Sequence, residues 1–513
     1  MKKQHFAPLI KVALAAVLLM AICLPTFGCA SNNGTNTDNL MEMINTLKAE
    51  NDVLKNQLND QKTQMDELKA NNEALTEKLD EIGNTVDKLD SISKAHDYDF
   101  YFTVGTLPTL YATLNAYTEQ NPNTYMWFER GNTISYEYSA DFINYFPTQS
   151  QTNKNSTYDQ AVIRAKIEEI LEKDPEAEFH FYCDDLRVAL IINIFVRAGV
   201  DFEDLEVTIL SDGTGTYFDF ANQTDESYAS YAETWNAKLK EAVDGRSDPN
   251  FKWPYADDES GVELRGLGYY LTTLPNVELW VQHPDYLMAD SETVMKAKES
   301  MNIVKKDPKA MYDALGTSCY DYQKAVLANA LVDSDTLTTL EQAAQYFDSK
   351  LKARDKDVVL ILGTSKTTLA ENKDYIDATV SFYTPTVLPN NKTTVMYKGK
   401  AYGISEGDTT VYIDGRTLKI GELGVYLFFK GHPAHIVDEE VQQYFADNGI
   451  EMLPHRTPVE VLFWMYDVKA GGFESTSFLS CSAGQTEFFF GMPTSTALLQ
   501  MMDAGFFDGV KIF

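Results

Sequence analysis

The chain has 513 residues, of which 44% are hydrophobic and 12% aromatic, which excludes a disordered chain and allows large folded cores. Its 43 Lys and Arg against 76 Asp and Glu give a net charge of −33. That charge excludes nucleic acids and anionic lipid surfaces as main partners, because proteins that bind phosphate backbones gather basic residues. The five cysteines are too few for a disulfide scaffold, so we expect those of the folded part to be free thiols.

The first thirty residues have the pattern of a secretory signal. Lysines precede an apolar run over 12–24, and a small residue, Cys29 and a polar run follow it. This order resembles bacterial lipoprotein signals, in which the cysteine is lipidated. We predict a signal peptide over 1–28, lipidation of Cys29, a flexible linker over 29–39, and a location at the bacterial cell surface. The alternative is an uncleaved signal anchor; either way, membrane contact is expected only here.

Residues 40–95 carry a heptad repeat. Every seventh residue from Leu40 is mostly leucine, and the companion series from Ile44 is mostly apolar. Asn51 and Asn72 interrupt that companion series, and paired asparagines are tolerated best in two-stranded coils. The repeat predicts an α-helical coiled-coil stalk that joins the protein into a parallel homodimer. A trimer and a helix folded against the rest of the protein are the alternatives.

From residue 97 onward, short aromatic or β-branched runs alternate with helical patterns, with a mostly helical middle over about 226–345. This alternation predicts an α/β head of parallel sheets crossed by helices. The expected strands are 100–104, 178–182, 206–210, 358–362, 425–429 and 450–453. They fall in two halves, and two such domains facing one another would enclose a central cleft at the carboxyl ends of their strands.

Two polar residues follow predicted strands, one in each half. Asp212 precedes Gly213 and is well placed as a general base, although Asp-Gly after a strand is more often an ordinary turn. His432 can donate a proton near neutral pH, although a single loop histidine is usually unremarkable. His435 and His455 raise the possibility of a metal, but no cysteine or carboxylate completes a ligand spacing, so we predict no metal.

Hydroxyl and carboxylate groups also open predicted helices. Ser475, Thr476 and Ser477 follow a Gly-Gly strand, where hydroxyls and helix-start amides suit a phosphate, or else form an ordinary N-cap. Glu460 is placed to accept hydrogen bonds from ribose hydroxyls, or to complement a helix dipole. The pair 184–185 superficially suggests a metal-binding Asp pair, but it serves equally well as a helix cap.

Taken in order, six segments of the head resemble the successive motifs of the bacterial sialyltransferases of glycosyltransferase family 80. The similarity is patchy but spans the whole head. The segments are Gly105-Thr106-Leu107-Pro108-Thr109-Leu110, Asp212-Gly213-Thr214, Gly363-Thr364-Ser365, Phe429-Lys430-Gly431-His432-Pro433, Pro458-Val459-Glu460-Val461-Leu462 and Gly471-Gly472-Phe473-Glu474-Ser475-Thr476.

The resemblance implies a GT-B fold of two Rossmann-like domains that face a central cleft. It implies an enzyme that transfers sialic acid from CMP-sialic acid to an acceptor hydroxyl, expected on a galactoside, with inversion and without metal or cofactor. Residues 97–265 with 491–513 would form the acceptor domain, and residues 266–490 the CMP-sugar domain. Asp212 would be the general base, and His432 would assist departure of the CMP phosphate.

The remaining roles come from the same resemblance. Donor binding would fall to Gly363, Thr364, Lys430, Pro433, Glu460, Ser475 and Thr476. Acceptor binding would fall to Thr106, Gly213 and Thr214. Because the whole chain repels an anionic donor, we expect attraction from Lys430, His432 and the helix-start amides near Ser475.

The sequence departs from the family's pattern at two places. Ser211 replaces the first acidic residue before Gly213, and the position near Thr367 lacks the family's acceptor-stacking tryptophan. Acceptor identity and linkage therefore do not carry over. Two alternatives are a transferase for another CMP-activated acidic sugar such as Kdo, and an inactive surface lipoprotein that binds glycans. The second follows from location, because CMP-sugars are made in the cytoplasm whereas this head is expected outside it.

Overall fold

The computed structural model describes residues 34–93, 96–128, 134–146, 160–184, 188–247, 266–333, 336–352, 355–404, 409–413, 415–433 and 435–513. The predicted signal peptide over 1–28 and the predicted lipidation site Cys29 lie outside these residues. The chain separates into two units, residues 1–90 and the head, residues 91–513. Across the described residues, no helix is both long and apolar enough to cross a membrane.

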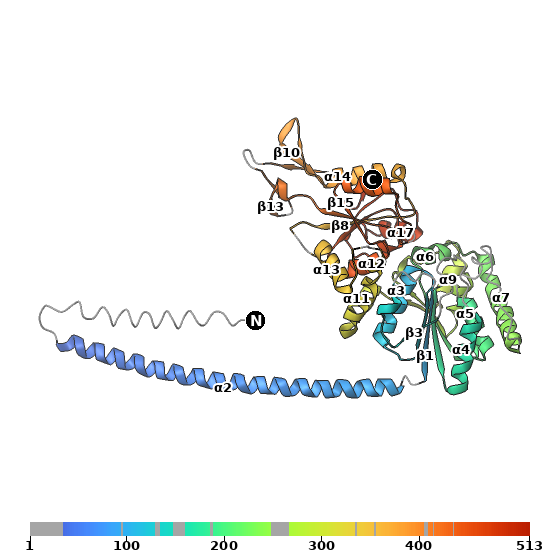
Figure 1. Cartoon of the computed structure of the whole chain (residues 1–513), viewed down its shortest axis with the longest axis horizontal. Helices are drawn as coiled ribbons and strands as arrows, with labels where there is room; N and C mark the ends of the chain where they lie inside the picture. The colour runs from blue at the N-terminus through green and yellow to red at the C-terminus, as the bar shows by residue number, and fades with distance from the viewer. Residues whose placement is uncertain are drawn as a thin grey trace. The chain divides into compact units, whose positions relative to one another are not determined.

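One long helix, α2, dominates the first unit and runs over Gly34–Ser93 (Figure 1). Residues 34–39 are therefore helical, and their assignment to a flexible linker was wrong because the polar residues of this stretch suit a helix as well as a loop. Apolar side chains of the heptad positions stand exposed along the single chain, with 39% to 68% of their surface accessible. They are Ile44, Leu47, Leu54, Leu58, Met65, Leu68 and Leu75.

The first lobe of the head is a seven-stranded parallel sheet in the order β3-β2-β1-β4-β5-β6-β7. Its strands are β1 (Asp97–Thr103), β2 (Thr124–Phe128), β3 (Ile143–Tyr145), β4 (Glu178–Asp184), β5 (Leu205–Leu210), β6 (Val277–Val281) and β7 (Ile303–Lys305). Its crossing helices are α3 (Thr106–Glu119), α4 (Gln160–Lys173), α5 (Val188–Ala198), α6 (Thr214–Ala221) and α7 (Asp225–Asp244). Figure 1 shows α4 and α5 on one face of this sheet and α3 on the other. Coverage of both faces explains why these strands read as apolar runs.

The boundary expected between residues 265 and 266 was wrong. Strands β6 and β7 follow it in sequence, yet β6 pairs with β5 and β7 pairs with β6 in the first sheet. These strands have only five and three residues and lie among short helices, so their period-two signal was lost in the helical pattern. The helices that follow are α9 (Glu292–Lys298), α10 (Pro308–Ala314), α11 (Cys319–Leu327), α12 (Asn329–Val332) and α13 (Leu340–Leu351).

The second lobe is a six-stranded parallel sheet in the order β15-β14-β8-β16-β17-β18. Its strands are β8 (Val358–Leu362), β14 (Tyr426–Lys430), β15 (Ile450–Leu453), β16 (Lys469–Gly472), β17 (Thr486–Phe489) and β18 (Lys511–Ile512). Its helices are α14 (Leu369–Tyr383), α15 (Glu439–Asp447), α16 (Val459–Met465) and the 3₁₀ helix η8 (Thr476–Ser480). The two sheets confirm the predicted α/β head of two domains.

The end of the chain visits both lobes. Helix α17 (Thr496–Asp503) packs against α6 of the first lobe, as the resemblance implied for residues 491–513. The last strand, β18, returns and pairs with β17 of the second sheet. The assignment of all of 491–513 to the first domain was therefore wrong, because a two-residue strand carries no periodicity that a sequence pattern can show.

A small β-rich insertion joins α14 to β14 and has no counterpart among the sequence expectations. It comprises β9 (Thr386–Leu388), β10 (Asn391–Tyr397), β11 (Lys400–Gly403), β12 (Thr410–Ile413) and β13 (Arg416–Lys419). All of its pairings are antiparallel, in sheets of three and two strands. It has its own small core, which includes Val395, Val411 and Leu423.

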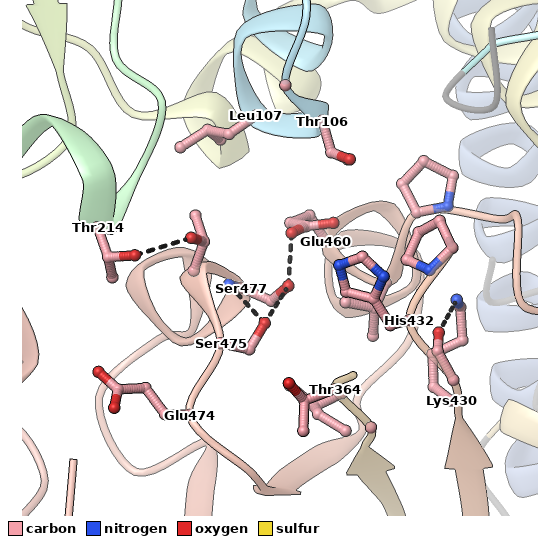
Figure 2. A pocket seen from close by; sticks show the side chains of 18 of the residues that line it. Thr106, Leu107, Thr214, Thr364, Lys430, His432, Glu460, Glu474, Ser475 and Ser477 are labelled. Carbon is pink, nitrogen blue, oxygen red and sulfur yellow. Dashed lines mark hydrogen bonds between the residues drawn. The ribbon is translucent and has the colours of Figure 1, made fainter. Parts of the chain in front are cut away.

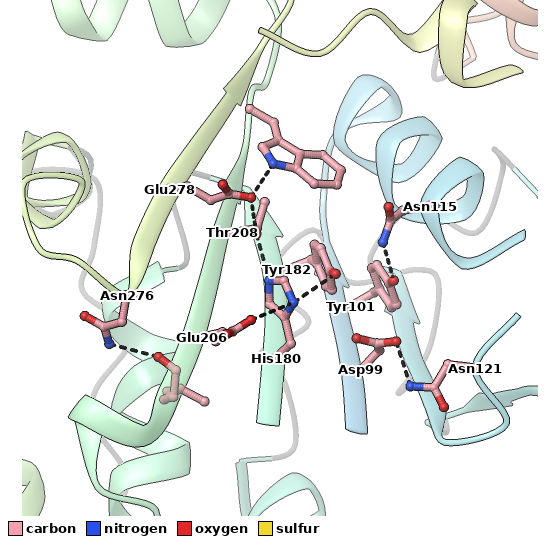
Figure 3. Close-up of polar contacts among 12 residues, drawn as sticks. Asp99, Tyr101, Asn115, Asn121, His180, Tyr182, Glu206, Thr208, Asn276 and Glu278 are labelled. Carbon is pink, nitrogen blue, oxygen red and sulfur yellow. Dashed lines mark hydrogen bonds and ion pairs between the residues drawn. The ribbon is translucent and has the colours of Figure 1, made fainter. Parts of the chain in front are cut away.

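One face of the first sheet carries a partly buried chain of hydrogen bonds (Figure 3). The His180 ring lies 3.0 Å from the Tyr182 hydroxyl and 2.8 Å from Thr208 Oγ1, and Thr208 donates to Glu278 Oε1 at 3.1 Å. Burial lowers the pKa of His180 to about 4, so this histidine is neutral at physiological pH. The chain of hydrogen bonds satisfies polar groups inside the lobe.

Candidate active site

The carboxyl ends of both sheets open onto one cavity of about 430 Å³ (Figure 2). Every predicted site residue of the head lines this cavity except Gly213. They are Thr106, Asp212, Thr214, Gly363, Thr364, Lys430, His432, Pro433, Glu460, Ser475 and Thr476. The cavity lies where open parallel sheets bind ligands, at strand ends and helix starts.

The first lobe contributes a carboxylate that is packed tightly against main chain. Asp212 follows β5, and its main-chain amide donates to Thr216 Oγ1 at 2.8 Å. Its carboxylate lies against Gly105, the residue before α3: a Cβ added there would stand 2.0 Å from Asp212 Oδ1. The absence of a side chain at Gly105 therefore creates the space that the Asp212 carboxylate occupies.

The second lobe contributes a hydrogen-bonded group of hydroxyls at the start of η8. Ser475 caps this helix, and its Oγ accepts from the Ser477 amide at 3.3 Å. Ser477 Oγ donates to Glu460 Oε1 at 2.6 Å, which joins η8 to α16. The Glu460 side chain is only 4% exposed, so this bond fixes the orientation of a buried carboxylate.

Ser477 was not among the predicted site residues, although it belongs to the hydroxyl run that we singled out. Its partner Glu460 precedes it by seventeen residues in a different element, so no local spacing signals their contact. Glu474 was also missed. It lines the cavity and accepts hydrogen bonds from the main-chain amides of Thr494 and Ser495 at 2.8 and 2.6 Å.

The two lobes touch at the edge of the cavity. Thr214 Oγ1 of the first lobe lies 3.1 Å from Thr476 Oγ1 of the second. Gly213 has a φ of +67°, and a Cβ there would lie 1.9 Å from Thr476 Cγ2. Gly213 therefore packs against Thr476 and allows the close approach of the lobes, and its role in acceptor binding stays a prediction.

A second contact between the lobes lies behind η8. The His283 ring, just after β6, lies 3.0 Å from the Leu479 carbonyl, and Gln282 Nε2 donates to Ser480 Oγ at 3.3 Å. Both ends of η8 are thus held by the first lobe, one at Thr476 and one at Leu479 and Ser480. This arrangement sets the position of the hydroxyls relative to Asp212.

Lys430 is the last residue of β14 and His432 follows it, and their side chains point in different directions (Figure 2). The His432 ring lines the cavity and lies 4.9 Å from the ring of His435. Lys430 is 3% exposed, and its ammonium donates to the main-chain carbonyls of Gly431 at 3.0 Å and His455 at 2.5 Å. The Lys430 ammonium is directed to main-chain carbonyls, so it is less able to attract an anionic donor than we expected from the sequence.

In the described part of the head, no group of three or more histidine, cysteine, aspartate or glutamate side chains is placed to hold a metal. His455 Nδ1 lies 3.3 Å from Asp333 Oδ2 instead. Asp184 is buried at the end of β4 and accepts from the Val104 amide at 2.8 Å, which favours a structural role for it. Residue 185 lies outside the described residues.

The position near Thr367, where the family has a tryptophan that stacks on the acceptor, is bordered by Lys366. The Lys366 ammonium lies 4.6 Å from the centre of the Phe473 ring.

Comparison with known proteins bears on the fold. No protein-family model matches the chain, and no curated protein matches its sequence. A solved 2,6-sialyltransferase from Vibrionaceae Photobacterium sp. JT-ISH-224, in complex with CMP and lactose, is similar over 81% of this chain and 78% of its own, with 13% identity and a TM-score of 0.50. A sialyltransferase from Photobacterium damsela is similar over 81% of both chains, with 15% identity and a TM-score of 0.50. The head has a GT-B fold.

The GT-B architecture explains why the site is divided. Each Rossmann-like lobe directs its strand ends at the other, so a carboxylate from one lobe and hydroxyls from the other meet in one cavity. Asp212 can accept a proton, and His432 can stabilise a developing negative charge. The hydroxyls and amides at the start of η8 can hold an anion such as a phosphate.

Proposed function

We propose that the head is a glycosyltransferase that moves sialic acid from CMP-sialic acid to a hydroxyl of an acceptor glycan, a galactoside, with inversion of the anomeric carbon. The observation that carries this proposal is the single cavity in which Asp212 of the first lobe meets His432 and Ser475 of the second. The resemblance of the motifs supports it, and the two solved proteins of similar fold that are compared above are sialyltransferases.

In the proposed reaction Asp212 takes the proton of the acceptor hydroxyl, and the acceptor oxygen forms a bond to the anomeric carbon. The bond from that carbon to the phosphate oxygen breaks, and its electron pair leaves with CMP. His432 stabilises the departing phosphate by a charged hydrogen bond or a proton, together with the Ser475 hydroxyl. One displacement inverts the anomeric carbon, and these steps require no metal.

Glu460 would bind the ribose of CMP. Its Oε1 already accepts from Ser477, and the bond leaves the carboxylate oriented toward the cavity that Glu460 lines. The donor is anionic and the chain carries a net charge of −33, so its attraction must be local. His432 and the amides at the start of η8 are the groups we assign to it.

We further propose that the protein is a lipid-anchored homodimer at the bacterial cell surface. The signal pattern that ends at Cys29 supports the anchor, and the exposed apolar stripe of α2 supports a second copy of the same helix. Sedimentation should show a dimer for residues 30–513 and a monomer for residues 97–513. Replacement of Cys29 by Ala should release the protein from the membrane fraction.

The function is tested by incubating the full chain with CMP-sialic acid and lactose and following CMP and product by mass spectrometry. We expect a trisaccharide, and little change on adding EDTA. CMP-Kdo in place of CMP-sialic acid separates the two donor classes. If no CMP-sugar is transferred or hydrolysed, the head is not a transferase of this kind, and binding of labelled glycans would then favour the lipoprotein alternative.

A further inference from the structure

Two loops of the second lobe meet at one buried lysine. The first loop follows β14 and contains Gly431, and the second follows β15 and contains His455. The Lys430 ammonium donates to the Gly431 carbonyl at 3.0 Å and to the His455 carbonyl at 2.5 Å. The whole side chain is only 3% exposed, so solvent does not compete for these bonds.

These two loops carry different parts of the site. The loop after β14 contains His432, and the loop after β15 leads through Pro458 into α16, which carries Glu460. Both side chains line the same cavity. Main-chain hydrogen bonds of the sheet end at Leu453, so the contact through Lys430 extends the connection of the two strands beyond their last paired residues.

Asp333, which follows α12, holds the second loop from its other side. Its Oδ2 accepts from the Arg456 amide at 2.6 Å, and its Oδ1 lies 3.2 Å from Arg456 Nε. The same carboxylate lies 3.3 Å from His455 Nδ1. With Asp333 on one side and Lys430 on the other, the loop over 454–458 is fixed at two successive residues.

We propose that Lys430 is a positioning residue: its ammonium ties together the loops that carry His432 and Glu460, and so sets the distance between the group that meets the phosphate and the group that meets the ribose. This role rests on the proposed function for the identity of the ligand, which is a nucleoside monophosphate. The existence of the tie does not depend on that function. Lys430 acts through the two carbonyls and does not need to touch the donor.

Burial and the charges around Lys430 determine the pH range in which its side chain is an ammonium that donates to both carbonyls. Burial disfavours its ammonium form, whereas Glu460 and Asp333 favour it, and a charged His455 ring would repel it. Burial dominates and lowers the pKa of Lys430 to about 8. The ammonium therefore predominates at pH 7, and the tie weakens as the pH rises through about 8.

Deprotonation of Lys430 does not destabilise the folded protein. A loss of ligand affinity as the pH rises through about 8 would therefore not be caused by unfolding that Lys430 brings about. Its folded pKa lies below its usual value, so the unfolded chain binds more protons above pH 8. The contribution of this group to stability therefore rises with pH in that window. As the pH rises above 8, the effect of Lys430 should be to increase the stability of the fold and to decrease the affinity for the ligand.

The test compares the full chain with Lys430→Met and with a matched control, Lys298→Met. Lys298 of the first lobe also donates to two main-chain carbonyls, those of Pro284 at 2.9 Å and Leu287 at 2.6 Å, but it does not line the cavity. Hydrogen–deuterium exchange at pH 7 should become faster in both loops, 431–433 and 454–460, in Lys430→Met. Lys298→Met should change exchange only near residues 284–287.

CMP is the ligand probe, and calorimetry measures its binding. Lys430→Met should weaken CMP about tenfold, the effect of one or two lost hydrogen bonds to the site's framework. Wild-type affinity should fall from pH 7 to pH 9, and the variant should lack this dependence. The wild-type pH series needs no variant, so it tests the tie even if Lys430→Met does not fold.

Unchanged exchange in either loop of a folded Lys430→Met protein would overturn the tie. Altered exchange with unaltered CMP affinity would overturn the positioning role. If wild-type protein binds no CMP, the proposed function fails instead, and the exchange data alone decide whether the two loops are joined by Lys430.

Discussion

The two sides of the cavity are built differently. On the first-lobe side, the Asp212 carboxylate is placed by close packing against Gly105. On the second-lobe side, side chains hold one another by hydrogen bonds: Ser477 holds Glu460, and Lys430 holds two loops. Packing tolerates no added atom, whereas a hydrogen-bonded group loses only part of its order when one member is removed. Substitutions on the two sides should therefore differ both in size and in the kinetic constant that they change.

The largest effect is expected from Asp212→Asn. The variant keeps the shape of the first-lobe side but lacks the base, so transfer should fall by about a thousandfold or more, while CMP affinity stays within about twofold. Initial rates and calorimetry with CMP measure the two quantities. Asp184→Asn is the matched control, since Asp184 also ends a strand of the first sheet but holds the Val104 amide. It should lower the unfolding temperature and leave the ratio of transfer to binding unchanged. Loss of CMP binding in Asp212→Asn would contradict the assignment of the base to the first lobe and of CMP binding to the second.

Gly105→Ala should give the next largest effect. The new methyl group would stand 2.0 Å from Asp212 Oδ1, so the carboxylate must move. We expect kcat to fall by about a hundredfold, as small misplacements of a catalytic group do, with little change in CMP affinity. Gly421→Ala, where an added Cβ meets nothing within 4 Å, is the control and should behave as wild type. An unchanged kcat in Gly105→Ala would show that packing does not place the base.

Ser477→Ala tests the hydrogen-bonded side. Glu460 Oε1 would lose the donor at 2.6 Å while the fold of η8 keeps its Ser475 cap. CMP should bind about tenfold more weakly, with kcat changed by less than about threefold, because the lost bond orients a binding group and not the base. Ser349→Ala removes an exposed serine that donates to its own helix and should have no effect. A fall in kcat without a fall in CMP affinity would refute this role for Ser477.

The smallest effect is expected where the two sides meet. Thr214→Val keeps the shape of the residue but removes the hydrogen bond to Thr476 across the cavity. We expect a two- to fivefold rise in the acceptor KM, on the scale of one partly exposed hydrogen bond. Initial rates at varied lactose concentration check this. A large loss of CMP affinity instead would mean that this bond shapes the phosphate site.

Much of the fold could be predicted from local pattern. Strands such as Val358–Leu362 are continuous apolar runs bounded by polar turns, and the structure confirms all six predicted strands to within a few residues. The short strands β6, β7 and β18 could not be predicted, because their place in a sheet depends on partners far away in the sequence. The antiparallel insertion over β9–β13 gave no expectation for the same reason.

The candidate site shows a similar limit. Motifs at strand ends identified the residues that line the cavity, because strand ends of open sheets share one edge. They did not show what each side chain contacts. Lys430 looked like a cation for the donor, yet its ammonium is directed to the carbonyls of Gly431 and His455. Gly213 looked like part of a lining, yet it makes room for Thr476. Such contacts join distant elements, and no spacing along the chain encodes them.

The central claim is that the two sides of the cavity together perform one displacement. Time-resolved proton NMR of the full chain with CMP-sialic acid and lactose tests it most directly. The account predicts that CMP and a sialylated trisaccharide appear at equal rates, and that the first product has the anomeric configuration opposite to that of the donor. A donor that persists unchanged, or a first product that retains the donor's configuration, would contradict it.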